Sequence, residues 1–103
     1  MIKIEKADTF LKRLRGLIGR KNLAQGYGLM IVPCNSIHML FMRFAIDAVF
    51  IDKNFVIKKI AHNLKAWTGI SICIGAWAVV EIAAGEAARL NLQVGQTLKV
   101  EVD

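Results

Sequence analysis

Two carboxylates lie inside apolar stretches of this sequence, where they could do acid–base chemistry. Asp47 lies within residues 46–51 and Glu81 within residues 79–82. A carboxylate with such neighbours either points to water or is buried and held by a cation or by backbone amides. Two inward carboxylates could act as general acid and base. We favour the simpler interpretation, a structural anchor at each position, and we expect Asp47 to be the buried one.

Three basic side chains are the candidate partners of these carboxylates. His38 and Arg43 lie in the same dense apolar block, residues 37–52. Arg15 borders the apolar stripe of a predicted helix, so its stem could lie on the core with its head turned inward. We therefore expect Arg15, His38, Arg43, Asp47 and Glu81 to converge in one cleft.

This cleft suggests two classes of function. The preferred one is a non-catalytic module that binds a protein, a peptide or a small ligand. Trp67, in a predicted loop, is a further candidate binding residue, because binding residues are common on loops. The alternative is a small hydrolase that uses Asp47 or Glu81 with His38. We lean against an enzyme, since each carboxylate has a simpler structural explanation.

Cys34 and His38 are spaced like two metal ligands, but a structural zinc site needs four. Cys73 and His62 alone could complete the set, and neither lies in a recognisable motif. As a nucleophile, Cys34 would need its thiolate stabilised by His38, and no flanking motif supports this. We predict no metal and no cofactor.

The net charge of +6 is concentrated near the N-terminus. A local basic patch formed by Lys12, Arg13, Arg20 and Lys21 could contact nucleic acid. The solvated side of a helix is the commoner use of such a cluster, so nucleic-acid binding is the weakest of the three hypotheses.

Apolar periodicity predicts a mostly β (α+β) fold. Alternating or short apolar runs predict strands, and apolar residues at helical spacing after Asp8 predict a helix. A second short helix is expected over residues 85–91.

Pairing of the two termini, antiparallel with Lys3 opposite Glu101 and Glu5 opposite Lys99, would close the sheet. We expect one domain, residues 1–103, with a small barrel-like sheet and two short helices. The expected strands cover residues 2–5, 29–32, 37–41, 44–51, 55–61, 70–74, 78–82 and 97–102.

Neither a membrane span nor a signal peptide is predicted. The longest apolar-leaning run, residues 70–84, is shorter than the roughly 20 residues of a span and contains Glu81. The first residues alternate at once, without an apolar export segment. We therefore expect a cytoplasmic protein whose two cysteines are reduced.

Several short motifs are spread along the chain: Arg15-Gly16-Leu17-Ile18-Gly19-Arg20, Gly28-Leu29-Met30, Ser36-Ile37-His38, Phe41-Met42-Arg43, residues 46–52 (Ile-Asp-Ala-Val-Phe-Ile-Asp), residues 80–85 (Val-Glu-Ile-Ala-Ala-Gly) and Val94-Gly95. Together they resemble domain-of-unknown-function family 192, over about residues 7–100. The resemblance implies a compact, mostly β, barrel-like domain with short helices in prokaryotic proteins, with no established activity and no catalytic residues to carry over. Many relatives have proline where this chain has Ala45, Ala66 and Ala83, which implies looser turns there.

Overall fold

Two adjacent strands form the centre of the fold in the computed structural model, which describes residues 2–7, 23–39 and 42–102. Strands β4 (Ile46–Ile51) and β7 (Ala78–Ala83) pair antiparallel, and nearly all of their residues are buried. Strands covered on both faces need near-continuous apolar sequence, and both stretches have it. The exceptions are Asp47 and Glu81.

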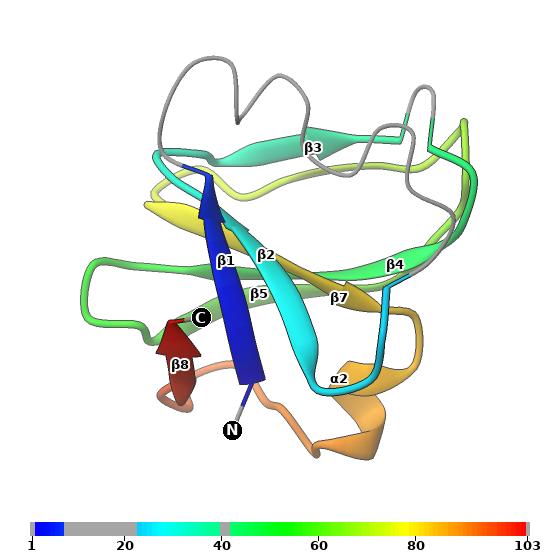
Figure 1. Cartoon of the computed structure of the whole chain (residues 1–103). Coiled ribbons are helices and arrows are strands. Elements are labelled where there is room, and N and C mark those ends of the chain that lie inside the picture. Colours follow the sequence, from blue (N-terminus) through cyan, green and yellow to red (C-terminus); the bar gives the residue numbers. More distant parts are fainter. Residues whose placement is uncertain (1, 8–22, 40–41, 103) are drawn as a thin grey trace.

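A mostly β architecture surrounds this pair (Figure 1). A six-stranded sheet has the order β5-β4-β7-β2-β1-β8, and β3 and β6 form a separate two-stranded sheet. The prediction of a mostly β fold is confirmed, and the described strands fall within or close to the predicted runs. The remaining elements are β1 (Ile2–Ala7), β2 (Tyr27–Ile31), β3 (Ser36–His38), β5 (Ile57–Leu64), β6 (Ile70–Ile72), α2 (Glu86–Arg89) and β8 (Val100–Val102).

The terminal strands pair, but the predicted direction was wrong. Strands β1 and β8 run parallel, with Ile2 opposite Val100 and Lys3 opposite Glu101. Apolar alternation satisfies a parallel and an antiparallel ladder equally well, because both put every second residue on the same face. The path of the chain decides the direction, since it enters β8 beside the start of β1, where the Ile2 amide donates to the Lys99 carbonyl at 3.3 Å.

The six-stranded sheet does not close into a barrel within the described residues. Its edge strands, β5 and β8, are not paired with each other; the segments just ahead of them are joined by an isolated bridge between Val56 and Thr97 and a few neighbouring backbone hydrogen bonds. The expected closure fails because only the residues ahead of β8 reach the start of β5, whereas β8 itself pairs with β1. The predicted helix after Asp8 lies outside the described residues, and the predicted second helix is α2.

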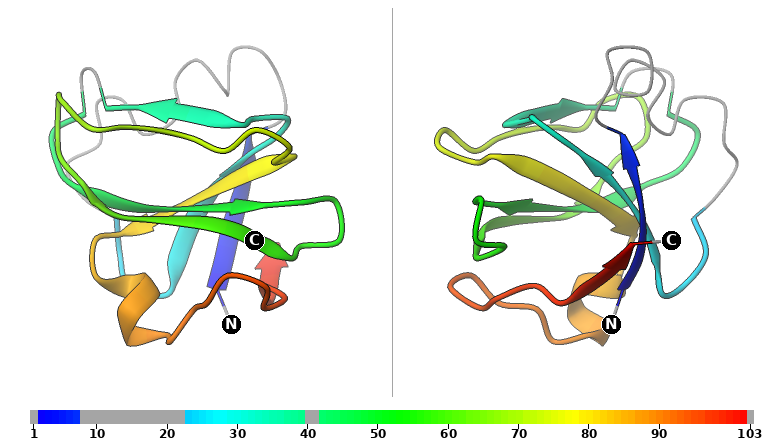
Figure 2. Two further views of the ribbon diagram at one scale, coloured as in Figure 1. Left: turned by 180° about the vertical axis from the view of Figure 1, so that it is seen from behind. Right: turned by 60° about the vertical axis from the view of Figure 1, so that its left-hand side comes forward.

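Each face of the central strands is covered by a different layer. One face packs in the main core cluster, which includes Val49, Val80 and Ala87 of α2. The other face packs against residues of β3 and its flanking loops, including Ile37 and Met39. Both views of Figure 2 place β3 and α2 at opposite ends of the molecule, with β4, β5 and β7 between them. Among the described residues, no helix has the length and apolarity to cross a membrane.

Candidate functional site

Asp47 is fully buried at an irregularity between β4 and β5. The register passes from Ile46 opposite Leu64 to Ala48 opposite Ala61, so Asp47 faces two residues of β5. Such a bulge takes backbone groups out of the ladder. The Asn63 amide donates to Asp47 Oδ1 at 2.8 Å, and Asn63 has a φ of 51°, which asparagine tolerates better than most residues. The carboxylate therefore satisfies an amide at the bulge.

The second oxygen of Asp47 binds the start of α2. Asp47 Oδ2 accepts hydrogen bonds from the amides of Gly85 and Ala87, both at 3.0 Å. Helix starts leave amides unsatisfied, and a Ser, Thr, Asp or Asn side chain normally accepts from them. The N-cap here is Gly85, with a φ of 92° and no side chain to do so. Asp47 supplies that acceptor from a distant strand.

Asp47 is thus a structural anchor held by three backbone amides. The sequence indicated the burial and the anchoring role but not these partners: Asn63, Gly85 and Ala87. One signal was available, because a predicted helix that begins at a glycine needs an acceptor from elsewhere. The expected pairing with Arg43 or His38 is not among the contacts of Asp47. Arg15 lies outside the described residues, so its predicted pairing stays a prediction.

Glu81 is also buried, at 3% exposure, but on the opposite face of the sheet. Ala48 lies directly opposite Glu81, and Asp47 directly opposite Ile82. Neighbouring residues of a strand point to opposite faces, whereas directly opposed residues share one. Asp47 therefore points to the α2 side and Glu81 to the side of β3. The structure does not bring the two carboxylates into one cleft.

The other predicted binding residues gather at the surface, at one end of the layer formed by β3 and β6. His38 is exposed on β3, directly opposite Ile70. The Trp67 amide donates to the Met39 carbonyl at 2.9 Å, and the Met42 amide, next to Arg43, donates to the same carbonyl at 3.0 Å. Arg43 is exposed. His38, Arg43 and Trp67 are therefore neighbours in the outer layer, away from Asp47.

Beside them is an apolar surface that we call the outer patch: Trp67, Ile70, Ile72 and Ile74. Their exposed fractions are 52%, 68%, 54% and 91%. In β6 the usual pattern is inverted, because Ser71 is buried while Ile70 and Ile72 face outward. Ile74 follows in a turn closed by the Ala76 amide, which donates to the Cys73 carbonyl at 3.1 Å. The outer patch is thus an unusual concentration of exposed large apolar side chains.

Lys59 ties β6 to the large sheet beside this patch. Its Nζ donates to the Ile72 carbonyl at 2.9 Å and lies 5.9 Å from the centroid of the Phe50 ring. Lys59 and Phe50 are directly opposed in β5 and β4. A charged donor and a cation–π contact therefore help to hold the outer layer in place.

Cys34 and His38 do not form the core of a metal site in the described structure. Cys34 Sγ donates to the Ser36 carbonyl at 3.0 Å, and Cys34 and Cys73 are both free thiols. Across residues 2–7, 23–39 and 42–102, no group of three or more His, Cys, Asp or Glu side chains is arranged to hold a metal ion.

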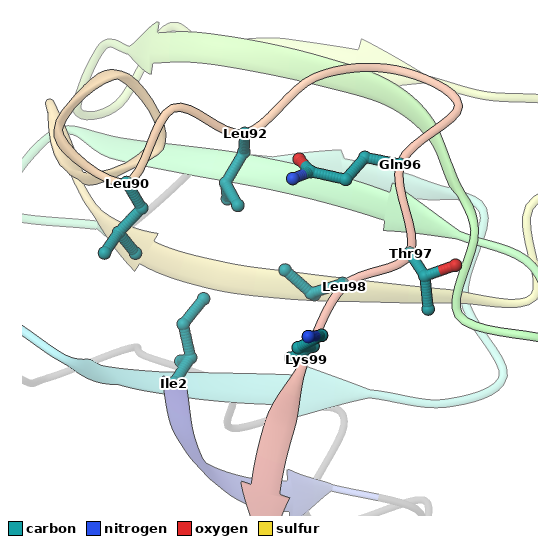
Figure 3. Close-up of a pocket in the computed structure, with 7 residues that line it drawn as sticks. All are labelled: Ile2, Leu90, Leu92, Gln96, Thr97, Leu98 and Lys99. Atoms are coloured by element: carbon teal, nitrogen blue, oxygen red, sulfur yellow. The ribbon is translucent and has the colours of Figure 1, made fainter.

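Two hollows lie elsewhere on the surface. Figure 3 shows the first, about 230 Å³, between the end of α2 and β8, with Ile2, Leu90, Leu92 and Leu98 around it. The second, about 250 Å³, is lined by Pro33, Cys34, Asn35, Ala76 and Trp77. Ligand pockets are usually about 300–1,000 Å³, so both are small. Of the predicted site residues that the structure describes, His38, Arg43, Trp67, Asp47 and Glu81 line neither hollow. Arg15 and the basic patch of Lys12, Arg13, Arg20 and Lys21 lie outside the described residues.

Comparison with known proteins agrees with the motifs found in the sequence. The profile of the DUF192 family, described as Uncharacterized ACR, matches residues 1–100. The chain belongs to the DUF192 family. Its relatives in this family include a UPF0127 protein of Thermococcus sibiricus, 32% identical over 98% of this chain and 68% of that protein. A UPF0127 protein of Pyrococcus furiosus is 32% identical over 95% of this chain and 86% of that protein.

A solved structure shares the fold. A protein of unknown function from Novosphingobium aromaticivorans superposes with a TM-score of 0.86 at 25% identity, over 95% of this chain and 74% of that one. These relatives come from prokaryotes, and the descriptions of the family and of the solved structure name no activity. The surface of this chain is therefore the remaining guide to its function.

Proposed function

We propose that this protein is a non-catalytic binding module whose docking surface is the outer patch, bordered by His38 and Arg43. The observation that carries the proposal is the inverted pattern of β6, where Ser71 is buried and Ile70 and Ile72 face water. Strand register normally turns the apolar residues toward the core. A shift of the register by one residue would move all of them to the solvent face, so it is strongly disfavoured. Departures from that rule are expected at functional surfaces.

The hydrolase alternative has less support. Asp47 already accepts from three backbone amides and points away from β3, which carries His38. Glu81 is enclosed, whereas His38 is exposed. A general acid and base must both reach one substrate atom, and the described geometry separates these groups.

The proposal also places the protein in the cytoplasm, in keeping with its two free thiols.

The nucleic-acid hypothesis depends on basic residues outside the described part of the chain. Nucleic-acid binding measured over a range of salt concentrations would test it, because binding through phosphate contacts weakens steeply with added salt.

The docking surface can be tested with the fluorescent probe 1-anilinonaphthalene-8-sulfonate, an apolar anion. We expect saturable binding with a rise in fluorescence, and about a tenfold weaker affinity in Ile72→Ser/Ile74→Ser, because the apolar contact area is lost. Val94→Ser/Val102→Ser is a matched control, since these valines are 64% and 67% exposed outside the patch. The proposal fails if the probe does not bind, or if both double variants bind it equally.

A further inference from the structure

The stretches of sequence that form the outer patch contain basic residues and no acidic ones. From Lys53 to Val80 the sequence contains four lysines and no carboxylate, and from Thr9 to Ile46 it contains no carboxylate either. Strands β3 and β6 and the loops that follow them are drawn entirely from these two stretches. Among the described residues, the carboxylates belong to β1, β4, β7, β8, α2 and the turn after β4. The exposed cations beside Trp67 are Arg43 and Lys65, and these are the charges that a partner of the patch would meet there.

The patch has a projecting apolar tip. Ile74 is 91% exposed in the Cys73–Ala76 turn, next to Gly75, whose φ is 93°. Trp67, with a φ of 68°, lies at the other end of the segment. Lys65 is exposed, and its carbonyl accepts the Gly69 amide at 2.9 Å. Aliphatic side chains at a turn, an exposed tryptophan and a lysine thus lie along one short segment.

We infer that the outer patch docks on the surface of an anionic lipid bilayer, with Ile72 and Ile74 entering the hydrocarbon boundary and Lys65 near the headgroups. Tryptophan favours the membrane interface, and lysines are attracted to anionic lipid, which is abundant on the cytoplasmic leaflet. Single-stranded nucleic acid suits this surface less well, because its bases stack on aromatic platforms and the patch is mainly aliphatic. This inference rests on the proposed binding function and names its partner.

Vesicle co-sedimentation tests the inference directly. We expect the wild-type protein to sediment with phosphatidylcholine vesicles containing about one third phosphatidylglycerol and to remain in solution with pure phosphatidylcholine. Binding should weaken with added salt, since screening reduces exposed charge interactions. Ile72→Ser/Ile74→Ser should reduce the partition coefficient about tenfold, and Lys65→Gln about fivefold. Val94→Ser/Val102→Ser should partition like the wild type.

Tryptophan fluorescence gives a second readout on the same vesicles. Trp77 packs edge-on against Phe55, with ring centroids 6.1 Å apart, and Trp77→Phe leaves Trp67 as the only tryptophan. Emission of this variant should shift to shorter wavelength on anionic vesicles, because an indole entering the interface leaves water. An unchanged spectrum in the vesicle-bound protein would overturn the proposed orientation.

The outcomes separate this inference from the proposed function. Binding of the fluorescent probe without binding of anionic vesicles would support the proposed docking surface but overturn the bilayer as its partner. Equal vesicle binding by wild type and Ile72→Ser/Ile74→Ser would also overturn it. Concentration-dependent dimerisation abolished by the same double variant, in the absence of vesicle binding, would identify a second copy of this chain as the partner instead.

Discussion

The backbone amide of Ala87 donates to Asp47 Oδ2 at 3.0 Å, although 40 residues separate the two in sequence. Through this contact and those to Gly85 and Asn63, one carboxylate joins β4, the bulge of β5 and the start of α2. Charge-assisted hydrogen bonds of this kind are about twice as strong as neutral ones. Asp47 therefore organises the fold on the α2 side of the sheet.

Asp47→Asn should destabilise the protein by about 2–4 kcal/mol. An asparagine amide has one acceptor oxygen, and its NH₂ group would face at least one of the three donating amides. Urea unfolding gives the change in free energy. Glu101→Gln, at an exposed carboxylate of β8, is the control and should change stability by less than about 0.5 kcal/mol. A near-neutral Asp47→Asn would contradict the anchoring role.

Lys59→Met should loosen the outer layer. The variant keeps an apolar stem but loses the hydrogen bond to the Ile72 carbonyl and the contact with Phe50. We expect about 1–2 kcal/mol lower stability and faster amide exchange in β3 and β6, measured by hydrogen–deuterium exchange. Lys58→Met is the neighbouring control, because exposed Lys58 pairs only loosely with Asp52, at 3.5 Å. Similar exchange in the two variants would show that Lys59 does not hold β6.

Gly69→Ala should be poorly tolerated for a steric reason. A Cβ there would lie 2.8 Å from the Lys65 carbonyl oxygen and 2.9 Å from both the Lys65 amide nitrogen and Met39 Cγ. We expect a loss of about 1–3 kcal/mol, measured by thermal unfolding. Gly75→Ala separates conformational from steric cost, because Gly75 has a positive φ but open space around its Cβ position. Equal effects of the two variants would contradict the crowding at Gly69.

Asp52 should contribute a pH-dependent part of the stability. Its Oδ1 accepts the amides of Val56 and Asn54, at 3.0 and 2.8 Å. The hydrogen bond from Val56 is the main cause that lowers the pKa of Asp52 from its ordinary value of 3.8, with the Asn54 amide and the charge of Lys58 adding to it. A group with a lowered folded-state pKa stabilises the protein above its unfolded-state pKa and loses this contribution as the pH falls through the folded value.

Asp52→Ala should therefore unfold at a lower temperature than the wild type at neutral pH. The difference in melting temperature should hold down to about pH 4 and narrow below it, where the wild-type carboxyl becomes protonated. Thermal melts across this range test the expectation. A difference that does not change with pH would mean that the charged form of Asp52 plays no part in stabilising the turn.

The strands were predictable from the sequence because apolar alternation is a local property. Residues 46–51 and 78–82 are apolar enough to be covered on both faces, and the structure buries them. The burial of Asp47 followed from the same neighbours. The turn after β4 lies between two of the expected strands, residues 44–51 and 55–61; Asp52 and Asn54 favour turns, and Asp52 accepts the Asn54 amide there.

The composition of the candidate site depended on long-range register instead. Asp47 and Glu81 have similar apolar neighbours, but pairing of β4 with β7 sends them to opposite faces. The partners of Asp47 are backbone amides, which almost every residue carries, so no residue type marks Asn63 or Ala87 as a ligand. The sequence by itself determined which segments are extended and that Asp47 is buried, whereas the burial of Glu81 and Glu86 came from the structure. Only the tertiary structure decided what Asp47 binds, and that β6 turns its isoleucines to water, because strand pairing and bulges select the face.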